Sequence, residues 1–181
     1  MILNSKNNNF IATFPKNFFY GKIRKRYEPL LKRLPLPYDG IHDYLNASIQ
    51  QFTFPGINVE TVEQTLSEDR VKWKDGFRLG KGFDKNFTVT FKNYEGYLNY
   101  WMMFDQFQEF LSYDNNNQFL PNITLSFLDQ SGFELVVIEF KQILMTGISE
   151  LELNFSSNTP EFQSFSCDFS YNYFELKRRL D

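Results

Sequence analysis

The feature that most constrains this chain is a stretch near its end in which apolar and small polar side chains alternate without a break. The apolar members are Phe165, Cys167, Phe169, Tyr171 and Tyr173, and the polar members are Ser164, Ser166, Asp168, Ser170 and Asn172. Successive side chains of a β-strand point to opposite faces, so this pattern predicts a strand with one buried face and one wet face. The polar face must meet water either outside the protein or inside a channel.

Shorter apolar alternations predict further strands along the chain. Residues 135–138 are all apolar, at odd and even positions alike, which is typical of a strand buried on both faces. The stretch at 86–91 alternates cleanly, with Phe87, Val89 and Phe91 on one side. The predicted strands are residues 8–14, 48–54, 86–91, 123–127, 134–143 and 151–155.

Two helices and a hairpin are also predicted. Residues 22–34 form a short basic helix that Pro35 ends, and residues 94–112 form the main helix. Residues 70–79 are predicted to form a hairpin around Asp75-Gly76, and residues 57–69 show no clear periodicity. The expected apolar face of the main helix is Tyr97, Tyr100, Trp101, Phe104, Phe107 and Leu111, with Glu95, Asn99, Asp105, Gln106 and Glu109 mostly opposite.

These elements favour a mainly β (α+β) fold, an antiparallel β-sandwich or barrel with one main flanking helix at about 94–112. A short basic N-terminal helix and an extended hairpin loop complete it. We expect a single domain over residues 1–181, with residues 1–45 as an N-terminal extension and residues 46–176 as the β core with its helix. The 22 Phe residues can build a well-stabilised core, and they can also supply subunit interfaces.

Charge is segregated along the chain. Residues 1–33 carry eight Lys/Arg and one acid, whereas residues 86–176 carry two Lys and twelve acids, for a net charge of −3 overall. A general polyanion binder would be basic throughout, so this composition argues against one. Segregated charge suits a protein whose ends meet neighbours, although a solvated acidic surface beside a basic helix explains it equally well.

The sequence argues against catalysis, cofactors and membrane insertion. His42 is the only histidine, so a histidine-based metal site cannot form from this chain, and we expect His42 to lie in a loop. Cys167 is the only cysteine, so an internal disulfide cannot form, and we expect a buried thiol in a protein folded in a reducing cytoplasm. Neither a phosphate-binding glycine motif, a signal peptide nor an apolar run of membrane-spanning length is present.

Carbohydrate binding is the alternative from a different functional class. Trp73, Trp101 and the ten Tyr residues offer stacking surfaces. Because Trp101 is expected on the core side of the main helix, Trp73 alone remains as an exposed platform. A sugar-binding β-sandwich therefore stays open as the second reading.

The order of features from Pro55 to Phe174 resembles the tail-tube proteins of long-tailed bacteriophages. Residues 54–57 (FPGI) precede a long charged loop, and residues 86–97 form a strand that leads into the main helix. Residues 147–153 and 165–173 resemble the closing pair of strands of that family, with the 122–143 strand-loop-strand between them.

This resemblance implies a structural virion protein without cofactors, whose copies form hexameric rings that stack into a tail tube. DNA would pass through the lumen without specific binding. The partners would be other copies and other tail or baseplate proteins, and assembly would take place in the cytoplasm of the host bacterium. The first 45 residues depart from a minimal tube subunit, so a tube initiator, a terminator and an adaptor ring remain alternatives.

The residues suggest where such an assembly makes its contacts. Lys and Arg on a channel wall would hold DNA by its phosphates, and the last strand presents small polar side chains instead. We therefore predict that Ser164, Ser166, Asp168 and Ser170 face the lumen, with bulk solvent outside the barrel as the alternative. Head-to-tail stacking needs complementary ends. The candidates for contacts between subunits or rings are Arg70, Lys72, Trp73, Lys74, Arg78, Lys22, Arg24 and Arg26.

Overall fold

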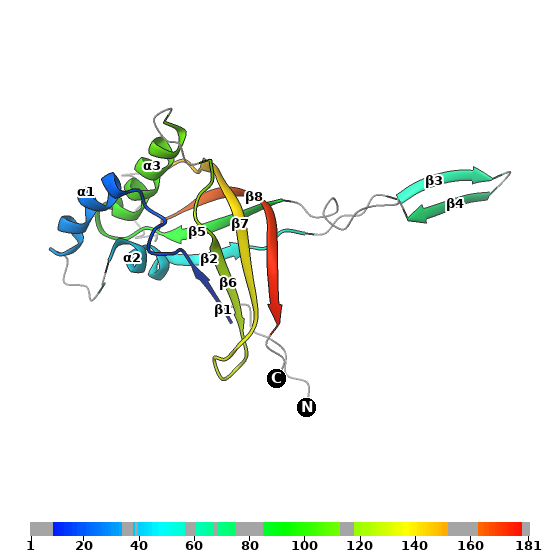
Figure 1. The fold of residues 1–181 in the computed structure, drawn as a ribbon, viewed down its shortest axis with the longest axis horizontal. Coiled ribbons are helices and arrows are strands. Elements are labelled where there is room, and N and C mark those ends of the chain that lie inside the picture. Colours follow the sequence, from blue (N-terminus) through cyan, green and yellow to red (C-terminus); the bar gives the residue numbers. More distant parts are fainter. Residues whose placement is uncertain are drawn as a thin grey trace, which may run out of the picture.

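The fold is a six-stranded antiparallel sheet that curls into a nearly closed barrel, with helices gathered at one end (Figure 1). The computed structural model describes residues 9–33, 38, 40–56, 61–66, 69–74, 85–112, 118–151 and 163–178, with 61–66 and 69–74 described by their backbone alone. The predicted mainly β fold with a flanking helix is confirmed.

The six strands of the barrel are not in sequence order. The sheet runs β1-β6-β7-β8-β5-β2, so β1 and β2 are its two edges. The strands are β1 (Phe10–Thr13), β2 (Ile49–Thr53), β5 (Asn86–Lys92), β6 (Ile123–Leu128), β7 (Glu134–Ile148) and β8 (Ser164–Arg178). The pairing places β1, from the first part of the chain, beside β6.

Two of the helices lie where the sequence predicts them, and one further helix was not predicted. The basic helix is α1 (Gly21–Leu31), and the main helix is a 3-10 turn η1 (Glu95–Tyr97) followed by α3 (Leu98–Leu111). The unpredicted helix is α2 (Ile41–Ala47), which carries His42; the expectation that His42 lies in a loop is therefore wrong. Only seven residues long, α2 shows too little periodicity to be read from sequence, and burial of Ile41, Tyr44 and Leu45 stabilises it.

The first strand of the predicted hairpin is present, and it pairs with a strand that was not predicted. β3 (Thr61–Leu66) pairs with β4 (Asp69–Lys74), with Val62 opposite Trp73, in a separate two-stranded sheet. The aperiodic stretch at 57–69 thus contains a strand, and the pairing runs to Leu66 opposite Asp69. Asp75-Gly76 and residues 77–79 of the predicted hairpin lie outside the described residues. β3 was not predicted because polar residues such as Glu63 and Gln64 interrupt its apolar alternation. Its register is set by pairing with β4.

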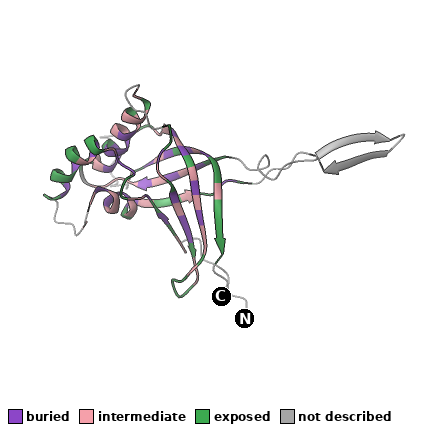
Figure 2. Ribbon diagram, viewed as in Figure 1, coloured by how far each residue is buried: buried purple, intermediate pink, exposed green. Residues whose placement is uncertain are grey.

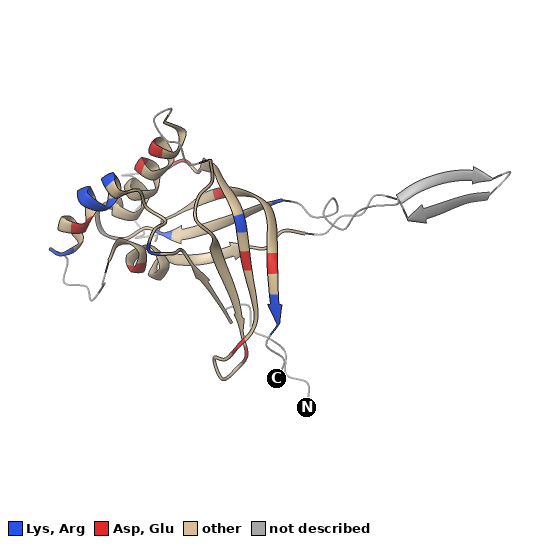
Figure 3. Ribbon diagram, viewed as in Figure 1, with Lys and Arg blue, Asp and Glu red and all other residues tan. Residues whose placement is uncertain are grey.

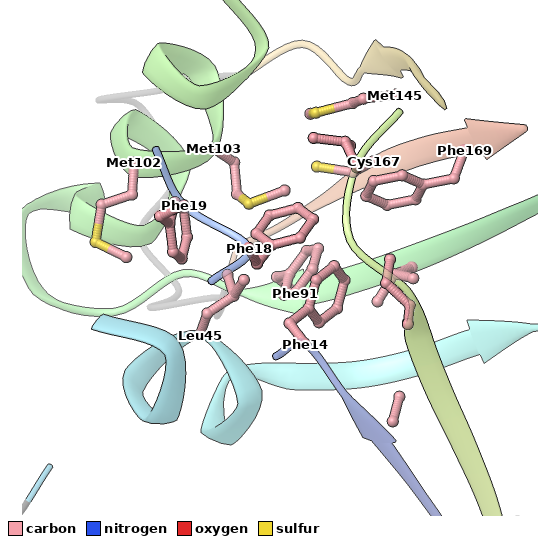
Figure 4. Packing of buried hydrophobic residues seen from close by; sticks show 14 of the residues in the cluster. Phe14, Phe18, Phe19, Leu45, Phe91, Met102, Met103, Met145, Cys167 and Phe169 are labelled. Atoms are coloured by element: carbon pink, nitrogen blue, oxygen red, sulfur yellow. The ribbon is translucent and has the colours of Figure 1, made fainter. Parts of the chain in front are cut away.

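The core is built from phenylalanine. Phe14, Phe18 and Phe19 from the segment after β1 meet Phe91 and Phe169 from the sheet (Figure 4). Phe87 stacks on Phe169 with ring centroids 5.2 Å apart, as the cross-strand pairing of β5 with β8 requires. Alternation predicted these faces correctly, because β5 and β8 each bury one face only (Figure 2). Phe14 to Phe19 also joins the N-terminal segment to the same core.

Two burial patterns and one strand predicted for the sheet differ from the structure. Leu135 is exposed and Val136 and Val137 are half-buried, so residues 135–138 are not buried on both faces. Tyr173 is exposed, and Phe174 takes the inner position instead. The strand predicted at 151–155 is not seen at Leu151, and its remaining residues lie outside the described part; β7 runs on to Ile148 instead.

The buried face of α3 is also wrong, because it is rotated from the prediction. The buried residues are Asn99, Tyr100, Met102, Met103 and Gln106, whereas Trp101 is 46% exposed and Leu111 is 63% exposed. The reason is hydrogen bonding. Gln106 Nε2 donates to the Phe18 carbonyl (2.9 Å), and Gln106 Oε1 accepts from the Tyr20 amide (3.1 Å), so a polar side chain faces inward.

Candidate assembly surfaces

A continuous polar face covers the outer side of β2, β5 and β8. The register places Thr53 beside Thr88 and Thr88 beside Asp168, and in the next row it places Gln51 beside Thr90 and Thr90 beside Ser166. Because inward and outward residues alternate on each strand, the rows share the side opposite Phe87 and Phe169. β5 and residues 164–170 of β8 contribute only two charged side chains to this face, Lys92 and Asp168.

Hydrogen bonds hold this polar face in place. Thr88 Oγ1 donates to Asp168 Oδ1 at 2.6 Å, and the Ser166 amide donates to Ser149 Oγ at 2.9 Å. Ser170 Oγ donates to the Lys85 carbonyl at 3.2 Å. At Gly147, a Cβ would lie 3.4 Å from Asp168 Oδ2, so a small residue allows close approach there. The result is an ordered surface of small side chains.

All four predicted lumen residues lie on this face of β8. Ser164 and Asp168 are exposed, and Ser166 and Ser170 are half-buried. The pattern therefore predicted their shared face correctly. Whether that face meets a lumen depends on the assembly and remains a proposal.

The basic helix α1 packs on α3 through ion pairs. Lys22 Nζ lies 2.8 Å from Glu109 Oε1, and an Arg26 guanidinium nitrogen lies 2.5 Å from Asp105 Oδ2. The two cationic side chains are 74% and 66% exposed, but the two acidic ones only 26% and 17%. The carboxylates are thus less exposed than the cations that pair with them, and the basic positions of α1 lie near the acidic positions of α3 (Figure 3).

Asp105 also binds a tyrosine of α1. Tyr27 Oη donates a 2.8 Å hydrogen bond to Asp105 Oδ2. Burial, the hydrogen bond to Asp105 and the charge of Asp105, in that order of size, together raise the pKa of Tyr27 to about 12. The neutral phenol is therefore the form that the folded protein holds.

The predicted contact residues fall into separate elements. Lys22, Arg24 and Arg26 lie on α1, whereas Arg70, Lys72, Trp73 and Lys74 lie on β4, whose side chains are outside the described set. Arg78 lies outside the described residues altogether. β4 pairs only with β3 in its own sheet, so pairing does not join the two groups.

The described side chains offer little for catalysis. Cys167 is fully buried, and burial raises the pKa of its thiol well above the ordinary value, which disfavours the reactive thiolate. His42 Nε2 contacts its neighbour Asp43 at 3.1 Å on α2. Among the described residues, His, Cys, Asp and Glu side chains do not gather in groups of three that could hold a metal ion. In that same part of the chain, the helices are too short or too polar to cross a membrane.

The fold is shared with solved structures of tail-like particles. The chain is similar to the anti-feeding prophage cap, an AFP tube terminating cap, at 12% identity and a TM-score of 0.57, with 98% of this chain and 93% of that chain covered. It is similar to a chain of the anti-feeding prophage baseplate at 11% identity and a TM-score of 0.57, with both chains covered completely.

A third similar structure is the PVC sheath-tube complex of an extracellular contractile injection system, in its extended state. The identity is 12% and the TM-score 0.52, and 94% of this chain and 88% of that chain are covered. Protein-family models and curated protein sequences give no match to the chain. At such low identity the likeness is one of fold, and that fold belongs to components of tubes, caps and baseplates.

Proposed function

We propose that this chain is a structural subunit, and not an enzyme, whose copies form hexameric rings that stack into a phage tail tube. A ring that starts, ends or adapts such a tube is the alternative within the same class. The observation that carries the proposal is the nearly closed barrel with its flanking α3, which the cap, baseplate and sheath-tube chains share over almost their whole length. On this view residues 1–181 act as one tail-tube-like domain.

The two edge strands support assembly with other copies. β1 and β2 each pair with one strand of the barrel, and no second described strand lies on their outer edges. An edge strand carries unpaired amides and carbonyls that another chain can pair with. Neighbouring subunits would continue the sheet around a ring.

The polar face supports a lumen lining. Ser164, Ser166, Asp168 and Ser170 would face the channel, where DNA passes without being held, because the face is poor in Lys and Arg. The basic surfaces of α1 and β4, with Trp73 and Arg78, would meet neighbouring subunits or rings, although Lys22 and Arg26 already pair with α3 inside the subunit.

The proposal also implies which partners the chain has and where it is located. The chain would bind copies of itself and other tail or baseplate proteins, without cofactors or membrane. It would assemble in the cytoplasm of the host bacterium and end in the tail of a virion-like particle.

Negative-stain electron microscopy of the purified protein across a concentration series tests the proposal. We expect rings or hollow filaments, whose diameter bounds the number of subunits. Rings that never stack would favour the cap or adaptor alternative. A monomer at every concentration would contradict self-assembly and favour sugar binding, for which the exposed Trp101 is a stacking surface the sequence did not predict.

A further inference from the structure

The turn between β6 and β7 presents an apolar side chain to solvent. Phe133 is 71% exposed, the highest value among the large hydrophobic residues that the structure describes, and Leu135 beside it is also exposed. Exposing a phenylalanine ring to water costs free energy that burial in a partner would recover. The turn also carries Asp129 and Glu134, and residues 119–140 contain no Lys or Arg.

This turn is rigid. Asp129 Oδ1 accepts hydrogen bonds of 2.8 Å from the amides of Ser131 and Phe133, and the Asp129 amide donates to the Phe133 carbonyl at 2.8 Å. Gly132 has a φ of +86°, which an L-residue adopts only with strain. The backbone that carries Phe133 is therefore constrained before any partner arrives, which lowers the entropy cost of binding.

A pocket of about 380 Å³ lies next to the N-terminal turn of α1. Residues 17–21 and Arg24 line one side, and residues 119–121 line the other. Phe18, Phe19 and Leu120 are buried behind the pocket surface, and Phe119 is partly exposed at it, so the accessible lining combines polar atoms with a smaller apolar part. Its volume is in the range of pockets that take small organic groups, so an aromatic ring can enter.

The pocket is electrostatically suited to an acidic partner. Arg24 Nε is buried and has no hydrogen-bond partner among the described residues. Residues 15–24 carry Lys16, Lys22 and Arg24 and no acid, and the first turn of α1 also lacks one. A helix N-terminus favours negative charge, so this side of the pocket is positive where an acidic residue is usual.

The turn and the pocket lie at opposite ends of one strand. Residues 119–121 immediately precede β6 and the turn follows it, so about 20 Å of extended strand separates them. Figure 3 shows the acidic turn far from the basic α1. Phe133 therefore cannot reach the pocket of its own chain.

We infer that Phe133 of one copy inserts into the pocket beside Arg24 of the next copy. The pocket has room for the ring, Phe119 offers it an apolar contact, the charges of the two surfaces are opposite, and both surfaces belong to the same chain. Such a contact joins two different surfaces, so it propagates head to tail into a ring or a stack. This inference rests on the proposed function, and it identifies one of the contacts by which copies would assemble.

Two substitutions at exposed positions test the contact without disturbing the core. Phe133→Ser removes the inserted ring, and Phe119→Glu puts a negative charge at the pocket. Each should raise the concentration needed for assembly, measured by analytical ultracentrifugation, by about tenfold or more, as loss of a central aromatic anchor does. Leu111→Ser is the matched control, because Leu111 is 63% exposed on α3 and lies outside the contact. The double variant Phe133→Ser/Phe119→Glu should be less impaired than the two single effects combined, since both act on one contact.

Photo-crosslinking identifies the partner residues directly. Benzoylphenylalanine replaces Phe133 in an unlabelled chain, which is assembled with ¹⁵N-labelled wild type and irradiated. We expect heavy–light crosslinks from position 133 to residues 17–24 or 119–121. Assemblies that form normally with Phe133→Ser, or crosslinks to other residues, would overturn this contact and leave the proposed function standing. If the wild type forms neither rings nor tubes, the proposed function fails, and the contact fails with it.

Discussion

Gln142 has a left-handed backbone conformation in the middle of β7, with a φ of 53°. Its Oε1 accepts a 2.9 Å hydrogen bond from Asn172 Nδ2 on β8. The buried residues on either side of it, Phe140 and Ile143, are three positions apart instead of two. The inward side of both strands therefore shifts by one residue here, which turns Tyr173 outward and Phe174 inward.

Gln142→Val should destabilise the protein by about 1–2 kcal/mol, although valine usually favours strands. The left-handed region brings Cβ close to the following carbonyl, and a β-branched side chain fits it worst. Urea denaturation of the purified variant measures the change in the free energy of unfolding.

Gln51→Val is the matched control, since Gln51 is an exposed strand residue whose φ is not positive. It should change the free energy of unfolding by less than about 0.5 kcal/mol. Gln142→Gly should be better tolerated than Gln142→Val, because glycine adopts positive φ without strain. Equal losses for the two valine variants would contradict the conformational explanation.

Gln106→Leu should cost about 3 kcal/mol, although it replaces a polar core side chain by an apolar one of similar size. The change removes both hydrogen bonds to the Phe18 carbonyl and the Tyr20 amide, and each buried backbone group left unpaired costs about 1–3 kcal/mol. Gln108→Leu, the same change at an exposed position of α3, should be nearly neutral. Urea denaturation measures the free energy of unfolding of both variants. Similar losses for the two would show that the two hydrogen bonds of Gln106 contribute little.

At the scale of elements, α1 is held to α3 chiefly around Asp105. The Lys22–Glu109 and Arg26–Asp105 pairs are partly exposed, and such pairs contribute little individually. Tyr27 is buried and donates to Asp105, and its folded pKa of about 12 lies above the ordinary value of 10. The neutral phenol therefore contributes stability that is complete below pH 10.

This contribution should be lost as the pH rises from 10 to about 12, where the folded protein is forced to ionise Tyr27. Tyr27→Phe removes the group, so the difference in free energy of unfolding between wild type and variant should shrink across this range. Chemical denaturation of both proteins at a series of pH values measures it. The other titrating groups are present in both proteins, so their contributions cancel in this difference. If the difference in free energy of unfolding stayed constant from pH 10 to 12, the role of Tyr27 would be contradicted.

At the scale of the whole molecule, the polar face can be converted from a passive surface into a DNA-binding one. Ser164→Lys together with Asp168→Lys places lysines at two exposed positions of β8. If this face lines the lumen, assembled rings of the variant should retain and protect short DNA from nuclease at ~0.1 M salt, with binding that weakens steeply as salt rises. Wild-type rings should retain little.

Gln108→Lys together with Leu111→Lys adds the same number of lysines to exposed positions of α3 and is the control. It should not protect DNA from nuclease, because bound DNA would remain outside the ring. Equal protection by both variants, or none by the first, would show that the β8 face does not line a channel.

The accuracy of the sequence analysis follows the range of the interactions concerned. β5 and residues 164–172 of β8 were predicted well because alternation over seven or more residues is a local property, and the basic α1 and the long α3 were found by their helical spacing. β3 was missed because its side chains are polar, and α2 because it is short. The polar set on β8 was found, whereas the Arg24 pocket could not be, since it needs residues about 100 positions apart.

The sequence by itself determined the strand faces of β5 and of residues 164–172 in β8, and the separation of basic and acidic charge. These follow from periodicity and composition, which act over neighbouring residues. Only the tertiary structure decided the strand order, the rotation of α3 and the shift of side at Gln142. Those depend on which buried carbonyls and amides find partners far along the chain, as Gln106 does with Phe18 and Tyr20, and local patterns do not contain that information.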